Sequence, residues 1–299
     1  MDTEVTEKVE FPSWLKRRLP ANYQDLKVLS KKLEKAGLHS VCQSAHCPNQ
    51  GECFSKGTAT FLLMGNICTR RCTFCAIKKG KPSSLDENEP ERLANTCKDM
   101  NLKHVVLTCV TRDDLKDGGA MHFVNCVRSI KNKIPGVTVE ILCSDMKGKR
   151  ESLEKLLSYP PEILNHNIET VPSLYRKVRK GAIYERSLEL ITRTRDIDPN
   201  VFTKSGLMVG CGETDDEIFM VMQEMVNAGC QIFTIGQYLA PRNSPLPVSR
   251  YVSPEKFLEY KEIGHEMGFL SVHAGAYVRS SYLAGDILQK ILDRRVDQQ

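Results

Sequence analysis

The segment TATFLLMGNICTRRCTFC, residues 58–75, joins a short apolar run to three closely spaced cysteines. The run at 58–64 is β-branched and apolar, a composition typical of a buried strand. Cys68, Cys72 and Cys75 follow it with the spacing C-x3-C-x2-C. The segment therefore predicts a strand that passes directly into a loop carrying three thiols.

Strand-like and helix-like segments alternate through the rest of the chain, as in βα units that build a parallel sheet. Five further strands are expected, at 104–110, 137–143, 163–168, 201–209 and 232–239. Thr214 to Glu217 fits a helix capping box, and Ser253-Pro254 fits an N-cap followed by a first-turn proline. The alternation permits an open doubly wound sheet or a partial or complete barrel. In both, ligands gather at the carboxyl ends of the strands.

Composition and charge exclude several classes of protein. Of the 299 residues, 41% are hydrophobic and 26% charged, close to an average globular protein and unlike a disordered or fibrous chain. The net charge of +5, from 42 basic and 37 acidic residues, is too small for a nucleic-acid footprint. No apolar run of about 18 residues is present, and the first residues are polar and acidic. We therefore expect a cytoplasmic protein that binds neither nucleic acid nor a membrane.

The twelve cysteines form two groups. Six lie within residues 42–75, and without a secretory signal their clustering favours a metal site over disulfides. The scattered six lie mainly in apolar stretches such as VVLTCV, so we expect buried, unreactive thiols there. These six are Cys97, Cys109, Cys126, Cys143, Cys211 and Cys230.

Three thiolates from one short loop can hold a [4Fe–4S] cluster and leave one iron without a protein ligand. Such an open position distinguishes a catalytic metal centre from a closed structural one. A zinc site on Cys72 and Cys75 is the alternative, but no second CxxC or histidine pair completes its four ligands. Cys42, Cys47 and Cys53, spaced C-x4-C-x5-C, again lack a fourth cysteine and suggest a second cluster.

CTRRCTFC, with Phe74 before its last cysteine, resembles the signature of radical S-adenosylmethionine enzymes. The first triplet resembles the auxiliary-cluster motif of lipoyl synthases, and this resemblance covers nearly the whole chain. Its further motifs are TRDDLKDGGA at 111–120, NHNIETVPSLYRKVR at 165–179, TKSGLMVGCGET at 203–214 and RSSY at 279–282.

The resemblance implies an α/β fold, a partial (β/α)6 TIM-type barrel at 58–268. A cysteine-rich N-terminal extension at 1–57 precedes it, and a C-terminal extension at 269–299 follows. It also implies radical-mediated insertion of two sulfur atoms at carbons six and eight of a protein-bound octanoyl group. The cluster on Cys68, Cys72 and Cys75 would bind S-adenosylmethionine, and the auxiliary [4Fe–4S] cluster would give up the sulfur.

The resemblance also implies site residues and partners. A serine of the RSSY motif would ligate the auxiliary cluster, and we favour Ser281 over Ser280. We expect Asn167, Glu169 and Lys204, together with Phe74, to contact S-adenosylmethionine or substrate. The implied partners are an octanoylated lipoyl-carrier protein or lipoyl domain, a low-potential electron donor such as ferredoxin or flavodoxin, and a cluster-repair carrier.

Three positions depart from the usual family pattern: Thr111 replaces a common aspartate, Met146 a common phenylalanine, and Leu283 a frequent histidine. None of them removes a predicted cluster ligand. The nearest alternatives are a methylthiotransferase or a biotin-synthase-like sulfur inserter. A non-catalytic cluster carrier is another alternative, and it would normally bring four cysteines per cluster.

Overall fold

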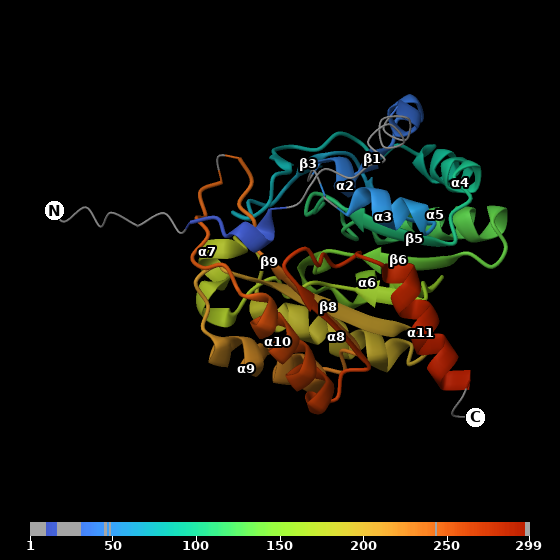
Figure 1. Ribbon diagram of the computed structural model, residues 1–299. Coiled ribbons are helices and arrows are strands. Elements are labelled where there is room, and N and C mark those ends of the chain that lie inside the picture. Colours follow the sequence, from blue (N-terminus) through green and yellow to red (C-terminus); the bar gives the residue numbers. More distant parts are fainter. Residues whose placement is uncertain (1–9, 17–30, 45–46, 48, 243, 297–299) are drawn as a thin grey trace.

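The computed structural model describes residues 10–16, 31–44, 47, 49–242 and 244–296 (Figure 1). One eight-stranded sheet has the order β1-β2-β5-β6-β7-β8-β9-β10. Its strands are β1 His39–Ser40, β2 Thr58–Leu63, β5 His104–Cys109, β6 Thr138–Leu142, β7 Ile163–Asn165, β8 Phe202–Val209, β9 Ile232–Gln237 and β10 Ser271–Gly275. All neighbours are parallel except β1 and β2. Within the described ranges β1 and β10 are edges, so the sheet forms a partial barrel of the α/β class.

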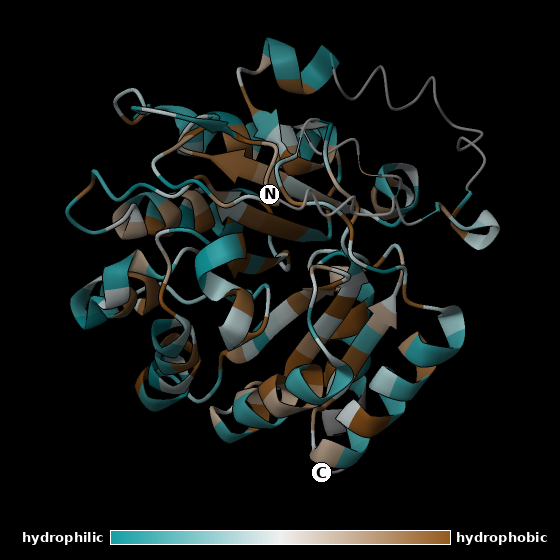
Figure 2. Ribbon diagram, turned by 90° about the vertical axis from the view of Figure 1, so that its left-hand side faces the viewer, coloured by the Kyte–Doolittle hydropathy of each residue, from teal (hydrophilic) through white to brown (hydrophobic). Residues whose placement is uncertain are grey.

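Helices cover the outer face of the sheet, and Figure 2 shows brown strands enclosed by helices with teal outer faces. Strands β2 and β9 are buried at every position, as expected where both faces of a parallel sheet are covered. The helices of three or more turns are α4 Glu89–Asp99, α5 Ala120–Lys133, α8 Tyr184–Ile197, α9 Asp215–Asn227, α10 Pro254–Met267 and α11 Ala284–Val296. The shorter ones are α2 Val41–Ser44, α3 Gln50–Ser55, α6 Arg150–Leu157 and α7 Tyr175–Val178.

The predicted helix starts are confirmed. Thr214 and Glu217 form a reciprocal capping box at the start of α9, and the Ser253 hydroxyl accepts from the Lys256 N–H at the start of α10. Leu26, Leu29, Leu33 and Leu38 have roughly helical spacing, so the sequence also predicts a helix here, which lies partly outside the described residues. Its described part, 31–35, is helical, and Leu33 and Leu38 are buried in the core.

Strand β7 is shorter than the predicted 163–168. The Ser205 hydroxyl on β8 accepts from the Ile168 N–H at 3.1 Å, which replaces a bond of the backbone ladder. Glu169 rejoins β8 through a single bridge to Leu207 and has a φ of 70°. This irregular end turns the chain at Asn167 and Glu169 instead of continuing the pleat.

The prediction of about six strands is corrected by β10, which runs parallel to β9 inside the segment we assigned to the C-terminal extension. Its sequence, SVHAG, is short and has only two apolar residues, Val272 and Ala274, so its strand signal is weak. After β10 the chain returns to α11, where Ile287, Leu288 and Ile291 pack on the first residues of β7, β8 and β9. The segment 276–283 therefore runs from the carboxyl end of the sheet to its amino end.

His104, the first residue of β5, is buried near the amino end of the barrel. Its Nδ1 lies 2.8 Å from the Thr138 hydroxyl, and its Nε2 has no hydrogen-bond partner in the described structure. Burial, followed by the charge of Lys204, lowers the pKa of His104 from 6.5 to about 3. As the pH falls below 6.5, the His104 ring gains a proton in the unfolded chain, whereas in the folded chain it stays neutral until about pH 3. The stability that the neutral ring gives the fold above pH 6.5 is therefore lost as the pH falls toward 3.

We expect His104→Asn, which keeps a polar atom facing Thr138, to flatten the acid side of the stability profile. Urea unfolding at pH 7 and pH 4.5 measures this, because the free energy of unfolding should fall less between these values in the variant than in the wild type. An equal fall in both proteins would show that the His104 ring does not resist protonation.

Candidate functional site

The second cysteine triplet lies on a loop that leaves the carboxyl end of β2. Strands β3 (Ile67–Cys68) and β4 (Lys78–Lys79) close the loop as a small parallel ladder, which pairs Cys68 with Lys79. The Gly80 N–H donates to the Cys68 carbonyl at 3.0 Å, and Lys79 Nζ donates to the Cys75 carbonyl at 2.5 Å. The loop is thus fixed at both ends and at its third cysteine.

Two neighbouring βα loops hold the triplet from outside. The Thr69 N–H and hydroxyl both donate to the Thr111 carbonyl, at 3.1 and 2.9 Å. The Thr73 N–H donates to the Val178 carbonyl at 2.9 Å. The contact at Thr111 uses the backbone only, so the departure from the family pattern at this position leaves it intact.

Arg70 anchors the loop electrostatically. Its guanidinium is buried and bonds two carboxylates, Asp113 at 2.7 and 3.0 Å and Asp145 at 2.5 Å. The Arg70 N–H also lies 3.4 Å from Cys68 Sγ. A buried cation between two carboxylates fixes the loop more firmly than an exposed pair would. Our sequence reasoning missed this role, although Asp113 stands in the quoted motif TRDDLKDGGA.

The thiols lie in each other's electrostatic field. Burial raises the pKa of Cys72 to about 11, with further increases from Cys75, Glu169 and Cys68, while Arg179 opposes the shift. Burial also raises the pKa of Cys75. All three thiols are free and half-exposed. Because such thiols bind metal only after losing their protons, this site would take up iron with proton release.

Asn167 and Glu169, two of the predicted contact residues, lie beside this triplet. Asn167 Nδ2 donates to Glu169 Oε1 at 3.2 Å, while Asn167 Oδ1 is buried without a partner in the described structure. Burial raises the pKa of Glu169, and the positive charge of Arg179 opposes it. An unsatisfied buried acceptor beside a carboxylate suits a ligand that brings hydroxyl or ammonium donors.

Arg179 is the second residue that our sequence reasoning missed. It is buried, and its guanidinium donates to the Tyr175 hydroxyl at 2.5 Å and the Ser187 hydroxyl at 2.9 Å. Its charge acts on both Cys72 and Glu169. The sequence RKVRKG reads as a solvated basic run, so nothing in it distinguishes the one buried arginine.

Lys204 corrects one of our predictions. It is the third residue of β8, so at about 3.3 Å per residue it lies about 16 Å from the carboxyl end at Val209. Its ammonium is fully buried and bonds both oxygens of Glu140, at 3.0 and 2.8 Å. Lys204 therefore belongs to the amino end of the barrel and not to its mouth.

Phe74 is half-buried and packs against the side chains of a small cluster. The cluster comprises Val178, Cys211, Tyr238 and Leu246. The Ser244 hydroxyl donates to the neighbouring Thr73 carbonyl at 3.1 Å. In this structure Phe74 fixes the cysteine loop against the end of β9, and its contact with a cofactor stays a prediction.

The first cysteine triplet begins just after β1, the strand that pairs with β2. Ser40 of β1 pairs with Phe61 of β2, and its hydroxyl accepts from the Cys42 N–H at 3.2 Å. A hydrogen bond with Cys47, followed by burial, raises the pKa of Cys42 well above its ordinary value. Two thiols in direct contact, with none in a disulfide, are available to one metal centre.

The C-terminal segment at 277–283 contacts the region of the N-terminal cysteine triplet. Asn49 Nδ2 donates to the Tyr277 carbonyl at 2.6 Å, and the Tyr282 hydroxyl donates to Glu52 at 2.9 Å. Burial raises the pKa of Cys53, and the Leu283 backbone N–H opposes this by bonding the thiol. Ser281, the predicted oxygen ligand, thus lies between two residues that touch the N-terminal cysteine region. Leu283 takes part through its backbone, so its departure from the family pattern leaves this contact intact.

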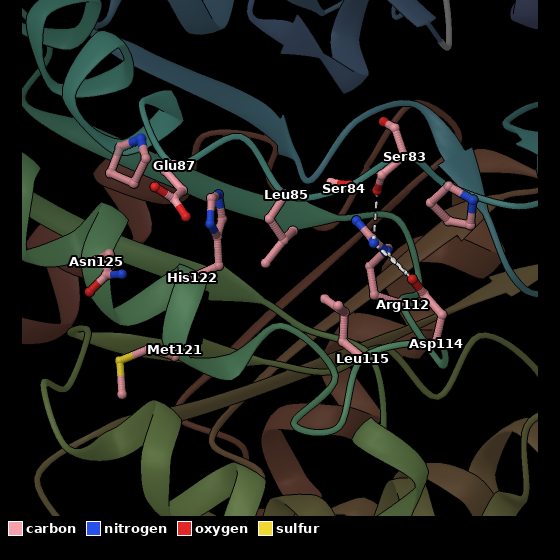
Figure 3. Close-up of a pocket in the computed structure, with 12 residues that line it drawn as sticks. Ser83, Ser84, Leu85, Glu87, Arg112, Asp114, Leu115, Met121, His122 and Asn125 are labelled. Carbon is pink, nitrogen blue, oxygen red and sulfur yellow. Dashed lines mark hydrogen bonds and ion pairs between the residues drawn. The ribbon is translucent and has the colours of Figure 1, made fainter.

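A cavity of about 860 Å³ lies between the loop at 82–87 and α5 (Figure 3). The buried Arg112 bonds Asp114 at 2.8 Å and the Ser83 carbonyl at 3.0 Å on its wall. None of the residues that line it is a cysteine or a predicted contact residue. The cavity is therefore separate from both thiol groups.

Residues 62–225 match the family model described as the Radical SAM superfamily. A lipoyl synthase from Caldanaerobacter subterraneus subsp. tengcongensis is 50% identical over 276 residues, which cover 92% of this chain and 96% of that protein. The chain belongs to the lipoyl synthase family. Another lipoyl synthase, from Photorhabdus laumondii subsp. laumondii, is also 50% identical, over 94% of this chain and 88% of that relative.

Solved structures support the fold at much lower identity. The methylornithine synthase structure has a TM-score of 0.53 and 15% identity, covering 93% of each chain. Streptococcus suis SuiB bound to its precursor peptide has a TM-score of 0.58 and 12% identity, covering 90% of this chain and 58% of that one. The expected α/β barrel of a radical S-adenosylmethionine enzyme is confirmed.

Lipoyl synthases are radical S-adenosylmethionine enzymes, so this chain is an enzyme that uses a [4Fe–4S] cluster and S-adenosylmethionine. Three free thiols on one anchored loop, with an unsatisfied Asn167 oxygen nearby, fit these two groups. Within the described ranges, no three His, Cys, Asp or Glu side chains meet as closely as a single metal ion requires. Nor does any described helix have the length and apolarity to cross a membrane.

The scattered cysteines agree with their predicted role. Five of them are buried, and Cys109 is half-exposed at the end of β5. Burial raises the pKa of Cys109 to about 12. Neutral, enclosed thiols of this kind are poor nucleophiles and poor metal ligands.

Proposed function

We propose that this chain inserts two sulfur atoms at carbons six and eight of a protein-bound octanoyl group, forming the lipoyl cofactor. The observation that carries the proposal is the placement of two incomplete cysteine triplets beside two paired strands, β1 and β2. The loop with Cys68, Cys72 and Cys75 leaves the end of β2, and the segment with Cys42 follows β1, which pairs with β2. A radical enzyme that only cleaves S-adenosylmethionine needs just the first of these sites.

Carbons six and eight of an octanoyl chain have no activating neighbour, so acid–base catalysis cannot break their C–H bonds. Cys68, Cys72 and Cys75 would hold a [4Fe–4S] cluster, which together with S-adenosylmethionine would supply the radical chemistry that these C–H bonds require. The protein's task is to hold its ligands in place and to exclude water. Arg70, Thr69 and Thr73 do the first by fixing the loop to two neighbouring βα loops.

The N-terminal triplet would hold the auxiliary [4Fe–4S] cluster that provides the sulfur. Cys42, Cys47 and Cys53 would bind it through three thiolates, and Ser281 would supply an oxygen ligand. An oxygen donor binds iron less strongly than a thiolate, so it can leave when the cluster is taken apart. The contacts of Asn49 and Glu52 with the C-terminal segment support this assignment because they bring 277–282 to the triplet.

Asn167 and Glu169 would bind S-adenosylmethionine beside the cluster on Cys68, Cys72 and Cys75. We expect Glu169→Ala to weaken S-adenosylmethionine binding by roughly 10- to 100-fold, the effect of losing a charge-assisted hydrogen bond. Equilibrium binding to the reconstituted enzyme measures this. Glu162→Ala is the matched control, because Glu162 bonds Lys131 and the Val139 N–H away from the site and should leave binding unchanged. Equal binding by wild type and Glu169→Ala would remove Glu169 from the site.

The partners of this reaction are proposals of the same kind. The acceptor is an octanoylated carrier protein or lipoyl domain, and the electron comes from a low-potential carrier such as ferredoxin or flavodoxin. A repair carrier rebuilds the auxiliary cluster after each turnover. The cytoplasmic location expected from the polar N-terminal sequence stays a prediction.

Mass spectrometry of an octanoylated lipoyl domain after anaerobic incubation tests the function. With the reconstituted enzyme, S-adenosylmethionine and dithionite, we expect a product that carries two sulfur atoms. Cleavage of S-adenosylmethionine without any sulfur in the product would point to a different radical enzyme. No cleavage at all, with tightly bound zinc, would reject the radical mechanism.

A further inference from the structure

Positive charge surrounds the loop that carries Cys68, Cys72 and Cys75. Neither residues 65–85 nor residues 170–184 contain an aspartate or glutamate. Together these two segments carry seven exposed cations: Arg71, Lys78, Lys79, Lys81, Arg176, Lys177 and Lys180. The whole chain has an excess of only five positive charges, so this local concentration is far above the average.

The two segments lie against each other. The Thr73 hydroxyl donates to the carbonyls of Lys177 and Val178, at 3.0 and 3.2 Å, and the Thr73 N–H donates to Val178 at 2.9 Å. On the other side of the loop, β4 pairs Lys79 with Cys68. The cations therefore flank the cysteine loop from both sides, and we name these seven side chains the basic collar. In Figure 1 the label β3 marks the side of the loop that pairs with β4, and the label α7 marks the side that contacts Thr73.

The charges of the basic collar are not neutralised by the carboxylates that the structure describes. Among the described residues, no carboxylate forms an ion pair with any of its seven members. Asp113 and Asp145, the carboxylates beside the loop, are both bonded to the buried Arg70. A group of unpaired exposed cations repels itself and lowers stability, so its placement calls for an acidic partner.

We propose that the basic collar is the docking surface of an acidic electron-carrier protein. This inference rests on the proposed function, in which the cluster on this loop must accept one electron for each S-adenosylmethionine that it cleaves. The carrier loses that electron and the cluster gains it. Docking on the collar places the carrier directly over the cysteine loop, and opposite charges raise the rate of productive encounter.

The test compares two quadruple variants with the same change of charge. Lys78, Lys81, Lys177 and Lys180 are replaced by glutamate in the collar variant. The control variant carries Lys98→Glu, Lys103→Glu, Lys261→Glu and Lys290→Glu, which are exposed positions outside the collar. Each reconstituted enzyme is given S-adenosylmethionine without octanoyl substrate, and the initial rate of 5′-deoxyadenosine formation is measured with reduced flavodoxin or with dithionite.

We expect the collar variant to lose roughly tenfold or more of its rate with flavodoxin at low salt, because electrostatic steering is worth about 10- to 1,000-fold. Its rate with dithionite should match the wild type, and the control variant should match it with both reductants. The wild-type rate should also fall with added salt only when flavodoxin is the donor, a result that needs no variant.

Several outcomes would overturn the proposal. Equal losses in the two variants would assign the effect to total charge, and a parallel loss with dithionite would assign it to the cluster or the fold. Normal 5′-deoxyadenosine formation by the collar variant with flavodoxin would overturn the proposal. If a second assay with an octanoylated lipoyl domain and dithionite then showed loss of lipoyl product, the collar would be the docking site of the carrier substrate. A wild-type enzyme inactive with dithionite would instead reject the proposed function itself.

Discussion

Cys68→Ala is expected to abolish cleavage of S-adenosylmethionine. The variant leaves the cluster of this loop with two thiolates, and the loop offers no replacement because Cys72 and Cys75 are its other cysteines. About four of about eight irons per chain should be lost, since each cubane cluster holds four. Iron analysis and chromatographic detection of 5′-deoxyadenosine measure both effects.

Cys42→Ala is the matched control for this prediction. It should also lose about four irons, but from the other cluster, so cleavage continues while no sulfur reaches the octanoyl chain. The two variants therefore have the same iron content and opposite cleavage results. Complete loss of cleavage in both, with both correctly folded, would contradict separate roles for the two triplets.

Lys204→Met is expected to destabilise the fold by about 3–5 kcal/mol, the usual result of leaving one partner of a buried ion pair uncompensated. The Glu140 carboxylate, fully buried, would lose the ammonium that bonds both of its oxygens and keep only Asn165. The free energy of unfolding in urea measures the effect. Binding of S-adenosylmethionine to the folded variant should remain at the wild-type level.

The double variant Lys204→Met with Glu140→Leu separates charge from packing. Replacing both partners by apolar residues of similar size removes the unpaired charge, so most of the lost stability should return. A double variant as unstable as Lys204→Met would show that the loss comes from packing. Weaker S-adenosylmethionine binding by a stable Lys204→Met protein would return Lys204 to the active site.

Much of the fold is predictable because its signals are local. The apolar runs of β2 and β5 and the capping box at Thr214 depend on neighbouring residues, which the sequence displays directly. Strand β10 has only a weak signal of this kind, and SVHAG joins the sheet because β9 offers it a free edge. Its position follows from the closing of the barrel and not from its own composition.

The site residues were predictable where the chemistry requires a fixed spacing in the sequence. They were less predictable where the position of a residue along the barrel determines its role. Cysteine triplets are visible because one cluster needs several thiols from one short segment. Asn167 and Lys204 both look like polar residues on strands, but Asn167 lies just beyond the end of β7 and Lys204 lies near the start of β8. Sequence periodicity gives the face of a strand and not the distance along the barrel. The burial of Arg70 and Arg179 could not be predicted either, because the residues next to them in the sequence are typical of an exposed segment.

Anomalous scattering from iron, in crystals of the anaerobically reconstituted enzyme, most directly tests the account of two separate centres. We expect two distinct iron peaks, one beside Cys68, Cys72 and Cys75 and one beside Cys42, Cys47 and Cys53. The Ser281 hydroxyl should lie within bonding distance of the second. A single peak, or a second centre whose fourth ligand comes from anywhere but the C-terminal segment, would contradict it.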